Sequence, residues 1–258
     1  MAPRRFPGGP AAGRASAVNL GSGMDLSVVI PVYQEVENVG PLYRELREVL
    51  DHLGGEWEVI FVDDGSSDGT FDALADLQAE DKRIRLIRFR ANAGQTAALD
   101  AGFKAAQGEA VVTMDGDLQN DPRDIPALLA LLDSYDAVCG WRWPRRDPWT
   151  RRASSRIANA VRNMASGDTV HDTGCTLKAF RRQCLTRLTL YRGMHRFLPT
   201  LLTMDGCRVA EVKVTHRPRL HGRSKYGIWD RLFVGLADLW AVRWMKKRRL
   251  RYEIEVSK

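Results

Sequence analysis

Two carboxylates separated by one residue, Asp115 and Asp117, are the side chains of this sequence best suited to chemistry. They follow Glu109–Met114, an apolar run that predicts a β-strand, and Gln119 adds a neutral oxygen two residues further on. Hard divalent cations such as Mg²⁺ and Mn²⁺ prefer oxygen ligands and complete their shells with substrate phosphate and water. The spacing therefore predicts a metal site, and an acidic surface turn is the plain alternative.

A second polar cluster, Asp63-Asp64-Gly65-Ser66-Ser67-Asp68, follows another predicted strand. Asp, Gly and Ser favour tight turns, and Asp68 is placed to cap the next helix. The carboxylates of Asp63 and Asp64 are also suited to hydrogen-bond a nucleotide base or ribose. Both interpretations hold together if Gly65 turns the chain while Asp64 faces a ligand.

The elements that must position these residues alternate between strands and helices, which predicts an α/β fold: an open, mostly parallel, Rossmann-like sheet with helices on both faces. Ligands bind such sheets at the carboxyl ends of the strands. The predicted strands are Asp25–Val32, Trp57–Val62, Ile84–Phe89 and Glu109–Met114. The predicted helices run from a cap at Asn38 to His52, over 71–80, and from Gln95 to about Ala106. The polar pairs at the four strand ends are Tyr33/Glu35, Asp63/Asp64, Asn92/Gly94 and Asp115/Asp117, and together they predict a site there.

Composition excludes several protein classes. With 258 residues, 44% hydrophobic and 28% charged, the chain can bury a sizeable core, so collagen-like, disulfide-framework and wholly disordered classes are excluded. The net charge of +7 hides an asymmetry: residues 1–140 carry 12 Lys/Arg against 23 Asp/Glu, and residues 141–258 carry 27 against 9. The acidic half suits a cation site, and the basic half suits an anionic partner.

Localisation is expected to be cytoplasmic. Residues 1–23 lack the apolar segment of a signal peptide and predict a disordered tail, and no window holds the ~18–20 apolar residues of a membrane span. The cysteines show no metal spacing and are expected to be reduced thiols. They are Cys139, Cys175, Cys184 and Cys207.

The basic half leaves alternatives open. Its Arg- and Trp-rich segment 141–163 suits phosphate binding, nucleic-acid binding or a solvated helix face. The stretch 227–245 predicts a helix with a tryptophan stripe, which is either a packed core helix or an amphipathic helix lying on a bilayer. We favour the bilayer because Lys246–Arg249 follow at once, although Asp230 and Asp238 oppose deep insertion. The expected domains are a tail (1–23), a catalytic domain (24–226) and a basic C-terminal helix and tail (227–258).

Seven segments, in order, carry a resemblance to family 2 glycosyltransferases of the GT-A fold. Jointly they are most similar to the polyprenyl-phosphate glycosyltransferases typified by dolichol-phosphate mannose synthase. The segments are VVIPVYQE (28–35), VDDGSSDGT (62–70), NAGQTAALDAGF (92–103), MDGDLQNDP (114–122), DTGCTLKAFRR (172–182), MHRFLP (194–199) and RLHGRSK (219–225). Two departures stand out: Gln34 replaces the usual Asn, and the transmembrane helices that follow the family's catalytic domain are absent.

The resemblance implies site residues position by position. Nucleotide-binding positions match Pro31, Tyr33, Glu35, Asp63, Asp64, Gly94 and Asp115. A Mg²⁺ or Mn²⁺ cofactor is implied at Asp115, Asp117 and Gln119. Positions that bind the acceptor phosphate match Arg142, Arg151, Ser155 and Ser224. Positions implied in catalysis match Asp117, Arg151, Arg219 and Lys225, the last two in a loop that closes over both substrates.

The function expected is inverting transfer of a hexose from a nucleotide sugar, of GDP-mannose or UDP-glucose type, to a polyprenyl phosphate at the cytoplasmic membrane face. A phosphate monoester is largely a dianion at neutral pH, so it requires positioning cations more than a general base. No nucleic acid is expected, and a membrane-protein partner or a homo-oligomer stays open.

Two other functions stay open. A soluble relative that glycosylates a hydroxyl group would need a carboxylate base, for which Asp172 is the first candidate. A catalytically silent membrane- or nucleic-acid-binding protein is the non-enzymatic alternative. Among the histidines, His195 is the one expected to line a pocket.

Overall fold

The computed structural model describes residues 24–143, 170–218 and 228–249. The first part of the chain alternates strands and helices, as the sequence predicts. In order, its elements are β1 (Leu26–Val32), α1 (Val36–Leu53), β2 (Trp57–Asp63), α2 (Thr70–Glu80), β3 (Ile84–Arg88), α3 (Gln95–Ala105), β4 (Ala110–Thr113), the 3₁₀ turn η1 (Pro122–Asp124), α4 (Ile125–Leu129) and β5 (Ala137–Arg142). The later elements are β6 (Lys178–Arg181), α6 (Arg182–Leu185), the 3₁₀ turn η2 (Met194–Phe197), α7 (Leu198–Met204), β7 (Val209–Val214) and α8 (Ile228–Arg248).

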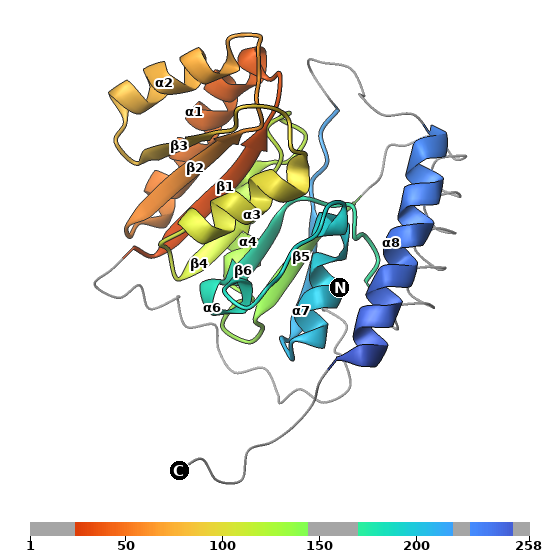
Figure 1. Cartoon of the computed structure of the whole chain (residues 1–258). Coiled ribbons are helices and arrows are strands. Elements are labelled where there is room, and N and C mark those ends of the chain that lie inside the picture. Colours follow the sequence, from red (N-terminus) through yellow and green to blue (C-terminus); the bar gives the residue numbers. More distant parts are fainter. Residues whose placement is uncertain (1–23, 144–169, 219–227, 250–258) are drawn as a thin grey trace, which may run out of the picture.

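The strands form one sheet in the order β3-β2-β1-β4-β6-β5-β7 (Figure 1). Its pairs are parallel except those of β6, which runs antiparallel to both β4 and β5. The order reverses between β1 and β4, which is where an open α/β sheet forms its ligand crevice. The expected α/β class is confirmed, whereas the antiparallel strand β6 was not predicted.

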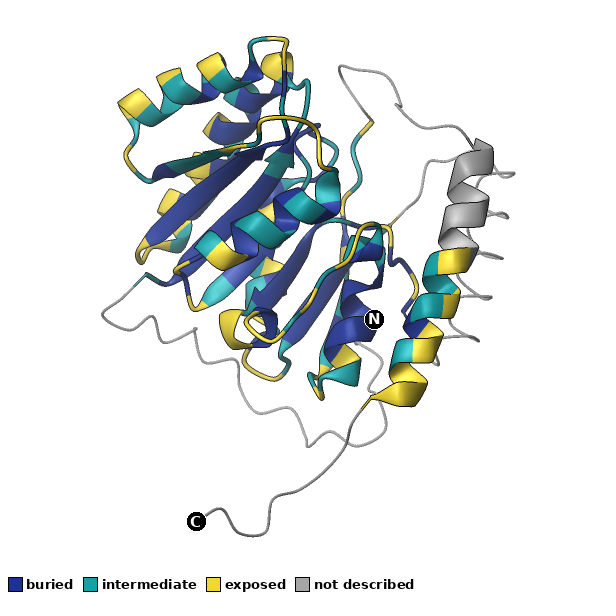
Figure 2. Cartoon of the chain, in the orientation of Figure 1, coloured by how far each residue is buried: buried dark blue, intermediate teal, exposed yellow. Residues whose placement is uncertain are grey.

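Burial of the central strands on both faces explains their continuous apolar sequences (Figure 2). In β1, Val28 and Ile30 belong to the core that includes Leu46 of α1, and Val29 belongs to the core that includes Leu99 of α3. The two cores therefore lie on opposite faces of the sheet. Helices cover both faces, so the strand ends are left as the exposed edge.

The start of α1 corrects one prediction. The helix begins at Val36, so Asn38 is no cap; it lies in the first turn and donates to Glu35 Oε2 at 2.6 Å. The reason is Gln34, whose φ of 57° turns the chain out of β1 directly into the helix. The N-cap residue of α2 is Gly69 and not Asp68, which corrects a second prediction; the Asp68 carboxylate lies just before it and accepts from the backbone N–H of Thr70 at 3.0 Å.

The C-terminal helix α8 confirms the helix predicted over 227–245. Val242 is fully buried in a cluster with Met194 and Leu201, so one side of α8 packs on the domain. Trp240 and Trp244 are 71% and 54% exposed, so the outer side keeps aromatic surface. None of the helices in the described residues is long and apolar enough to cross a membrane.

Candidate active site

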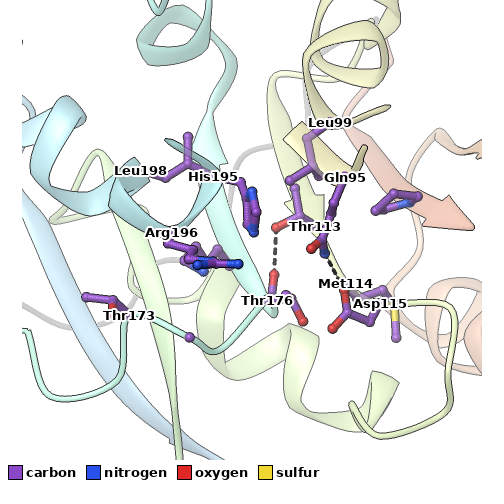
Figure 3. A pocket seen from close by; sticks show the side chains of 13 residues that line it. Gln95, Leu99, Thr113, Met114, Asp115, Thr173, Thr176, His195, Arg196 and Leu198 are labelled. Carbon is purple, nitrogen blue, oxygen red and sulfur yellow. Dashed lines mark hydrogen bonds between the residues drawn. The ribbon is translucent and has the colours of Figure 1, made fainter. Parts of the chain in front are cut away.

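A cavity of about 370 Å³ opens at the carboxyl ends of β1 and β4, where the strand order reverses. Polar and charged side chains from the sheet, from α3 and from the η2 turn face one another across it (Figure 3). Its lining comprises Pro31, Gln95, Leu99, Thr113, Met114, Asp115, Thr173, Gly174, Thr176, Lys178, His195, Arg196 and Leu198.

Asp115 is the carboxylate of this cavity, as the sequence predicts for a strand-terminal acid. Gln95 Nε2 donates to its Oδ1 at 2.8 Å, and its backbone N–H donates to Asn120 Oδ1 at 3.0 Å. Burial, together with the negative charge of Asp117, raises the pKa of Asp115 to about 6. The position therefore favours a cation that would relieve the repulsion between the two acids.

Asp117 and Gln119 lie on the turn that follows. Asp117 is buried, and its Oδ1 accepts from the backbone N–H of Gln119 at 3.2 Å. Leu118 between them has a φ of 61°, a left-handed conformation that is costly for leucine and that folds the turn tightly. The Gln119 amide directs Nε2 toward the Arg217 carbonyl at 3.5 Å, which leaves Oε1 as an acceptor.

This donor set fits a divalent cation that keeps substrate ligands. Within the described ranges, no group of three or more His, Cys, Asp or Glu side chains is placed to hold a metal. Mg²⁺ and its relatives do not need such a cage, because they bind through one or two carboxylates and take other ligands from phosphates and water. Asp115, Asp117 and Gln119 offer two carboxylates and an amide oxygen of this kind; of the three, Asp115 lines the main cavity and Asp117 and Gln119 do not.

Arg217 fastens the turn that carries these acids, a role that sequence reasoning missed. Its backbone N–H donates to the Gln119 carbonyl at 2.9 Å. Its guanidinium group forms ion pairs with Asp121 at 2.7 Å and with Glu45 of α1 at 2.6 Å. No local signal marks this arginine, since its partners lie 96 and 172 residues away in the chain.

The two acids at the end of β2 have different surroundings. Asp64 accepts from Asn92 Nδ2 at 2.9 Å and from the backbone N–H groups of Ala93 and Gly94 at 2.7 and 2.9 Å. Asp64 therefore holds the loop before α3, and its carboxylate is occupied by that loop. Gly94 has a φ of 93°, which a residue with a side chain rarely adopts.

Asp63 is the acid of this pair that keeps an oxygen without a hydrogen bond in the described residues. Its Oδ1 accepts from the Ser66 backbone N–H at 3.0 Å, whereas its buried Oδ2 has no hydrogen-bond partner among the described residues. Arg88 Nε lies 3.6 Å from that oxygen. A second cavity of about 330 Å³ is lined by Ser66 and Arg88 with Gly65, Phe89 and Arg90. The orphaned oxygen thus lies beside a cavity.

Cationic side chains form the opposite side of the main cavity. Lys178 on β6 pairs in register with Thr113, is 3% exposed and donates through Nζ to the Cys175 carbonyl. Arg196 projects from η2 (Figure 3). Both lie in segments that carry the resemblance, but neither was expected at the site. For Lys178 the reason is that the sequence did not predict the antiparallel strand β6, which directs this side chain into the cavity.

His195 lines the cavity, as predicted. Its Nδ1 lies 2.7 Å from Thr96 Oγ1, which also accepts from the Gly193 backbone N–H at 3.0 Å. Burial and the charges of Arg196 and Lys178 lower the pKa of His195 to about 3. The imidazole is therefore neutral, and its hydrogen bond with Thr96 Oγ1 fixes the orientation of the ring through Nδ1.

Asp172 orients an arginine. Arg142 Nε and one terminal nitrogen donate to the two carboxylate oxygens of Asp172 at 2.7 and 2.8 Å. Glu211 accepts from the Asp172 backbone N–H at 3.2 Å and secures this segment. A carboxylate held in this bidentate pair is poorly suited to act as a general base, which disfavours the hydroxyl-acceptor alternative.

The other predicted positions divide into two groups. Pro31 lines the main cavity, whereas Tyr33 and Glu35 lie in the β1–α1 connection and do not line it. Glu35 directs Oε2 to Asn38 Nδ2. The remaining predicted residues lie outside the described part of the chain: Arg151, Ser155, Arg219, Ser224 and Lys225.

Residues 27–189 of the chain match the family model of glycosyl transferase family 2. Dodecaprenyl-phosphate galacturonate synthase of Rhizobium johnstonii is 38% identical over 234 residues, which cover 88% of this chain and 69% of that protein. The undecaprenyl-phosphate 4-deoxy-4-formamido-L-arabinose transferase of Aeromonas hydrophila is 38% identical over 205 residues, covering 79% of this chain and 63% of the relative. The chain thus spans about two thirds of the length of these relatives.

Solved structures share the fold. Glucosyl-3-phosphoglycerate synthase of Mycobacterium tuberculosis, in complex with Mn²⁺, UDP and glucosyl-3-phosphoglycerate, has a TM-score of 0.64 at 22% identity, covering 87% of this chain and 80% of that one. A mannosyltransferase of Pyrobaculum calidifontis, in complex with GDP-Man and Mn²⁺, has a TM-score of 0.61 at 23% identity, covering 88% and 65%. These likenesses confirm the expected GT-A architecture.

Proposed function

This chain belongs to glycosyl transferase family 2, and on that basis we propose that it transfers a sugar from a nucleotide sugar to a polyprenyl phosphate. The two relatives described above act on polyprenyl phosphates by name, but they carry different sugars, galacturonate and a formamido-arabinose. Family membership therefore leaves the sugar open.

The observation that carries the proposal is the arrangement of charge across the main cavity. Asp115 lies on one side, at the predicted metal site, and Lys178 and Arg196 line the same cavity. A metal-bound diphosphate and an anionic acceptor repel each other in solution, and this distribution of charge lets both bind within one site.

The reaction follows from this arrangement. An oxygen of the acceptor phosphate attacks the anomeric carbon and forms the new C–O bond, while the bond from that carbon to the nucleotide diphosphate breaks and its electron pair leaves with the diphosphate. In-line attack inverts the anomeric configuration. The attacking phosphate is already ionised, so no side chain must remove a proton, in keeping with the pairing of Asp172 to Arg142.

For the cofactor, we propose Asp115, Asp117 and Gln119 as ligands of Mg²⁺ or Mn²⁺. The ion would supply charge neutralisation at the departing diphosphate. Arg217 keeps the turn of these ligands in place through Glu45 and Asp121. The M. tuberculosis and P. calidifontis structures contain Mn²⁺, which supports a divalent cation in this fold.

For the nucleotide, we propose that the base lies in the second cavity, beside Asp63. Oδ2 of Asp63 is buried without a hydrogen-bond partner in the described residues, so a base N–H would satisfy it. Tyr33 and Glu35 stay predictions for the same end of the donor. Asp64 contributes indirectly, by holding Gly94 and the loop before α3.

For the acceptor phosphate, we propose Arg142, oriented by Asp172, together with residues outside the described part of the chain. These are Arg151 and Ser155 for the phosphate, and Arg219, Ser224 and Lys225 for a loop that closes over both substrates. They rest on the family resemblance.

We propose that α8 attaches the catalytic domain peripherally to the cytoplasmic membrane face. Trp240 and Trp244 are exposed on its outer side, which suits insertion at headgroup depth. Lys246, Lys247 and Arg248 follow and would attract anionic lipid. The buried Val242 holds the helix to the domain, so attachment would bring the cavity close to a lipid acceptor.

The test is a donor screen. Purified protein, a short-chain polyprenyl phosphate and Mn²⁺ are incubated with radiolabelled nucleotide sugars, and the product is extracted into organic solvent. Acceptor-dependent label in the organic phase is expected for at least one donor. Label that appears equally with a free alcohol acceptor, or no lipid-linked product from any donor, would contradict the proposal.

A further inference from the structure

The main cavity holds more positive charge than one phosphate contact requires. Among its lining residues in the described chain, Asp115 is the one carboxylate, while Lys178 and Arg196 are both cationic. Neither cation forms an ion pair within 4 Å in the described ranges, although the charge of Arg196 acts on Asp238 and that of Lys178 acts on Asp115. The Cys175 carbonyl is the hydrogen-bond partner of Lys178 Nζ. A lysine ammonium has three donors, so Lys178 can still bind an anionic ligand.

The position of these cations indicates which part of a substrate they meet. Lys178 is 3% exposed and pairs with Thr113, two residues before Asp115, so it lies at the floor of the cavity beside the proposed metal site. A polyprenyl phosphate enters with its lipid chain trailing toward the membrane, so its phosphate approaches from the mouth. The group that reaches the floor is the sugar, which is joined directly to the metal-bound diphosphate.

The neighbouring carboxylate, Asp115, is engaged when the donor binds. Once a divalent cation and a diphosphate engage Asp115, that acid no longer balances the charge of Lys178. A neutral sugar would offer Lys178 and Arg196 hydroxyl groups alone, so their anionic partners would be the substrate phosphates and, for Arg196, the Asp238 carboxylate. A sugar carboxylate would form charge-assisted hydrogen bonds with both.

We propose that this cavity selects a hexuronic acid donor, whose C6 carboxylate is bound by Arg196 and Lys178. The inference rests on the proposed transferase function and names its substrate class. His195, neutral and held by Thr96, adds an uncharged hydrogen-bonding group to the sugar pocket and no further positive charge. Arg196 is the specificity-determining residue at the wall, and Lys178 is its counterpart at the floor.

The experiment compares donors that differ at C6 alone. The pairs are UDP-galacturonate with UDP-galactose, UDP-glucuronate with UDP-glucose, and GDP-mannuronate with GDP-mannose. We expect kcat/KM for the preferred uronate to exceed that of its neutral partner by at least about tenfold, as for hydrogen bonds to a charged group. Calorimetric binding of each pair with Mn²⁺, without acceptor, is the second readout.

The variants assign the preference to a residue. Arg196→Gln is expected to lower the uronate-to-neutral ratio about tenfold. Arg192→Gln, an exposed arginine of the same segment that does not line the cavity, should leave the ratio unchanged. Lys178→Met should also lower the uronate-to-neutral ratio. Because Lys178 is buried, the thermal unfolding of this variant is measured alongside its activity. If Lys178→Met does not fold, the result for Arg196→Gln decides.

The outcomes separate this inference from the proposed function. Lipid-linked product from neutral donors at equal or greater kcat/KM overturns the uronate preference and leaves the transferase function standing. Equal losses for both members of a pair in Arg196→Gln also overturn it, since that arginine would then bind a phosphate common to both. Absence of lipid-linked product from every donor overturns the transferase function itself, and the binding ratio then decides the pocket's preference alone.

Discussion

Asp172 and Arg142 form a bidentate pair, with nitrogen–oxygen distances of 2.7 and 2.8 Å. Such a pair fixes the plane of the guanidinium group and leaves the carboxylate without the role of a base. The distinction between orienting an arginine and removing a proton is open to measurement.

If Asp172 positions Arg142, Asp172→Asn should raise the KM for polyprenyl phosphate about tenfold while the pH profile of kcat keeps its shape. Steady-state kinetics between pH 6 and 9 check this. Asp136→Asn, which breaks the exposed Asp136–Arg208 pair elsewhere, is the matched control. Loss of the acidic limb of the pH profile in Asp172→Asn would instead identify a general base, because a base loses activity when it is protonated.

Asp117→Asn should lower transfer by about 10²–10³-fold, because it removes a charge from the proposed metal site at the departing diphosphate. The variant is expected to fold, as judged by its circular dichroism spectrum and melting temperature. Asp133→Asn changes an exposed acid away from the cavity and should retain activity. Normal turnover by Asp117→Asn would exclude the metal assignment.

Arg217→Met should raise the Mn²⁺ concentration required for half-maximal activity about 10-fold, because the turn that carries Asp117 and Gln119 loses its ties to α1. Metal titrations at saturating donor measure this. Arg208→Met removes an exposed arginine that pairs with Asp136, and its metal requirement should match the native protein's. A purely structural role for Arg217 would lower stability with no change in the metal titration.

His195 predicts a stability that depends on pH. Its pKa is about 3 in the folded state and near the ordinary 6.5 in the unfolded chain, so the unfolded chain binds more protons between these values. Stability contributed by the neutral ring is complete above pH 6.5 and is lost as the pH falls toward 3. In melting curves between pH 7 and 4.5, His195→Gln should therefore lose less stability on acidification than the native protein.

Asp115 acts in the opposite direction, because its pKa of about 6 lies above the ordinary carboxyl value and its contribution improves as the pH falls. The His195 effect is therefore the difference between native and His195→Gln curves, both measured without added metal. An identical pH dependence in the two proteins would contradict a buried neutral imidazole.

Attachment through α8 predicts that Trp240→Ala and Trp244→Ala together weaken binding to anionic liposomes, because both rings are exposed. Replacing Lys246, Lys247 and Arg248 by Gln should cost about 1 kcal/mol per residue at low salt and less as salt rises. Co-sedimentation with liposomes of varied charge measures both effects. Binding indifferent to salt and to lipid charge would contradict the proposal.

The sequence predicted the parts of the site that depend on local pattern. Strand-terminal position places Asp115 at the sheet edge, and the apolar runs of β1, β2 and β4 require a buried parallel sheet. Periodicity also predicts α8. These features follow from strand and helix geometry within a single segment of chain.

Long-range contacts determine the rest. Asp63 and Asp64 are adjacent and of the same residue type, so the local sequence does not distinguish their roles. Their environments differ because Asn92, 28 residues later, donates a hydrogen bond to Asp64. Lys178 enters the cavity because β6 inserts antiparallel beside β4, a pairing that no local pattern encodes. Arg217 likewise stabilises the acidic turn through ion pairs with Glu45 on α1 and with Asp121 after the turn.

The cluster that seats Val242 of α8 against Met194 and Phe197 brackets the two residues that form the cavity wall, His195 and Arg196. The membrane-facing helix α8 and the cavity wall at His195 and Arg196 are therefore packed together and support each other. Deleting the chain from Ile228 onward to obtain a freely diffusing enzyme would strip the support from that wall, so such a fragment would report altered donor choice as well as lost lipid contact.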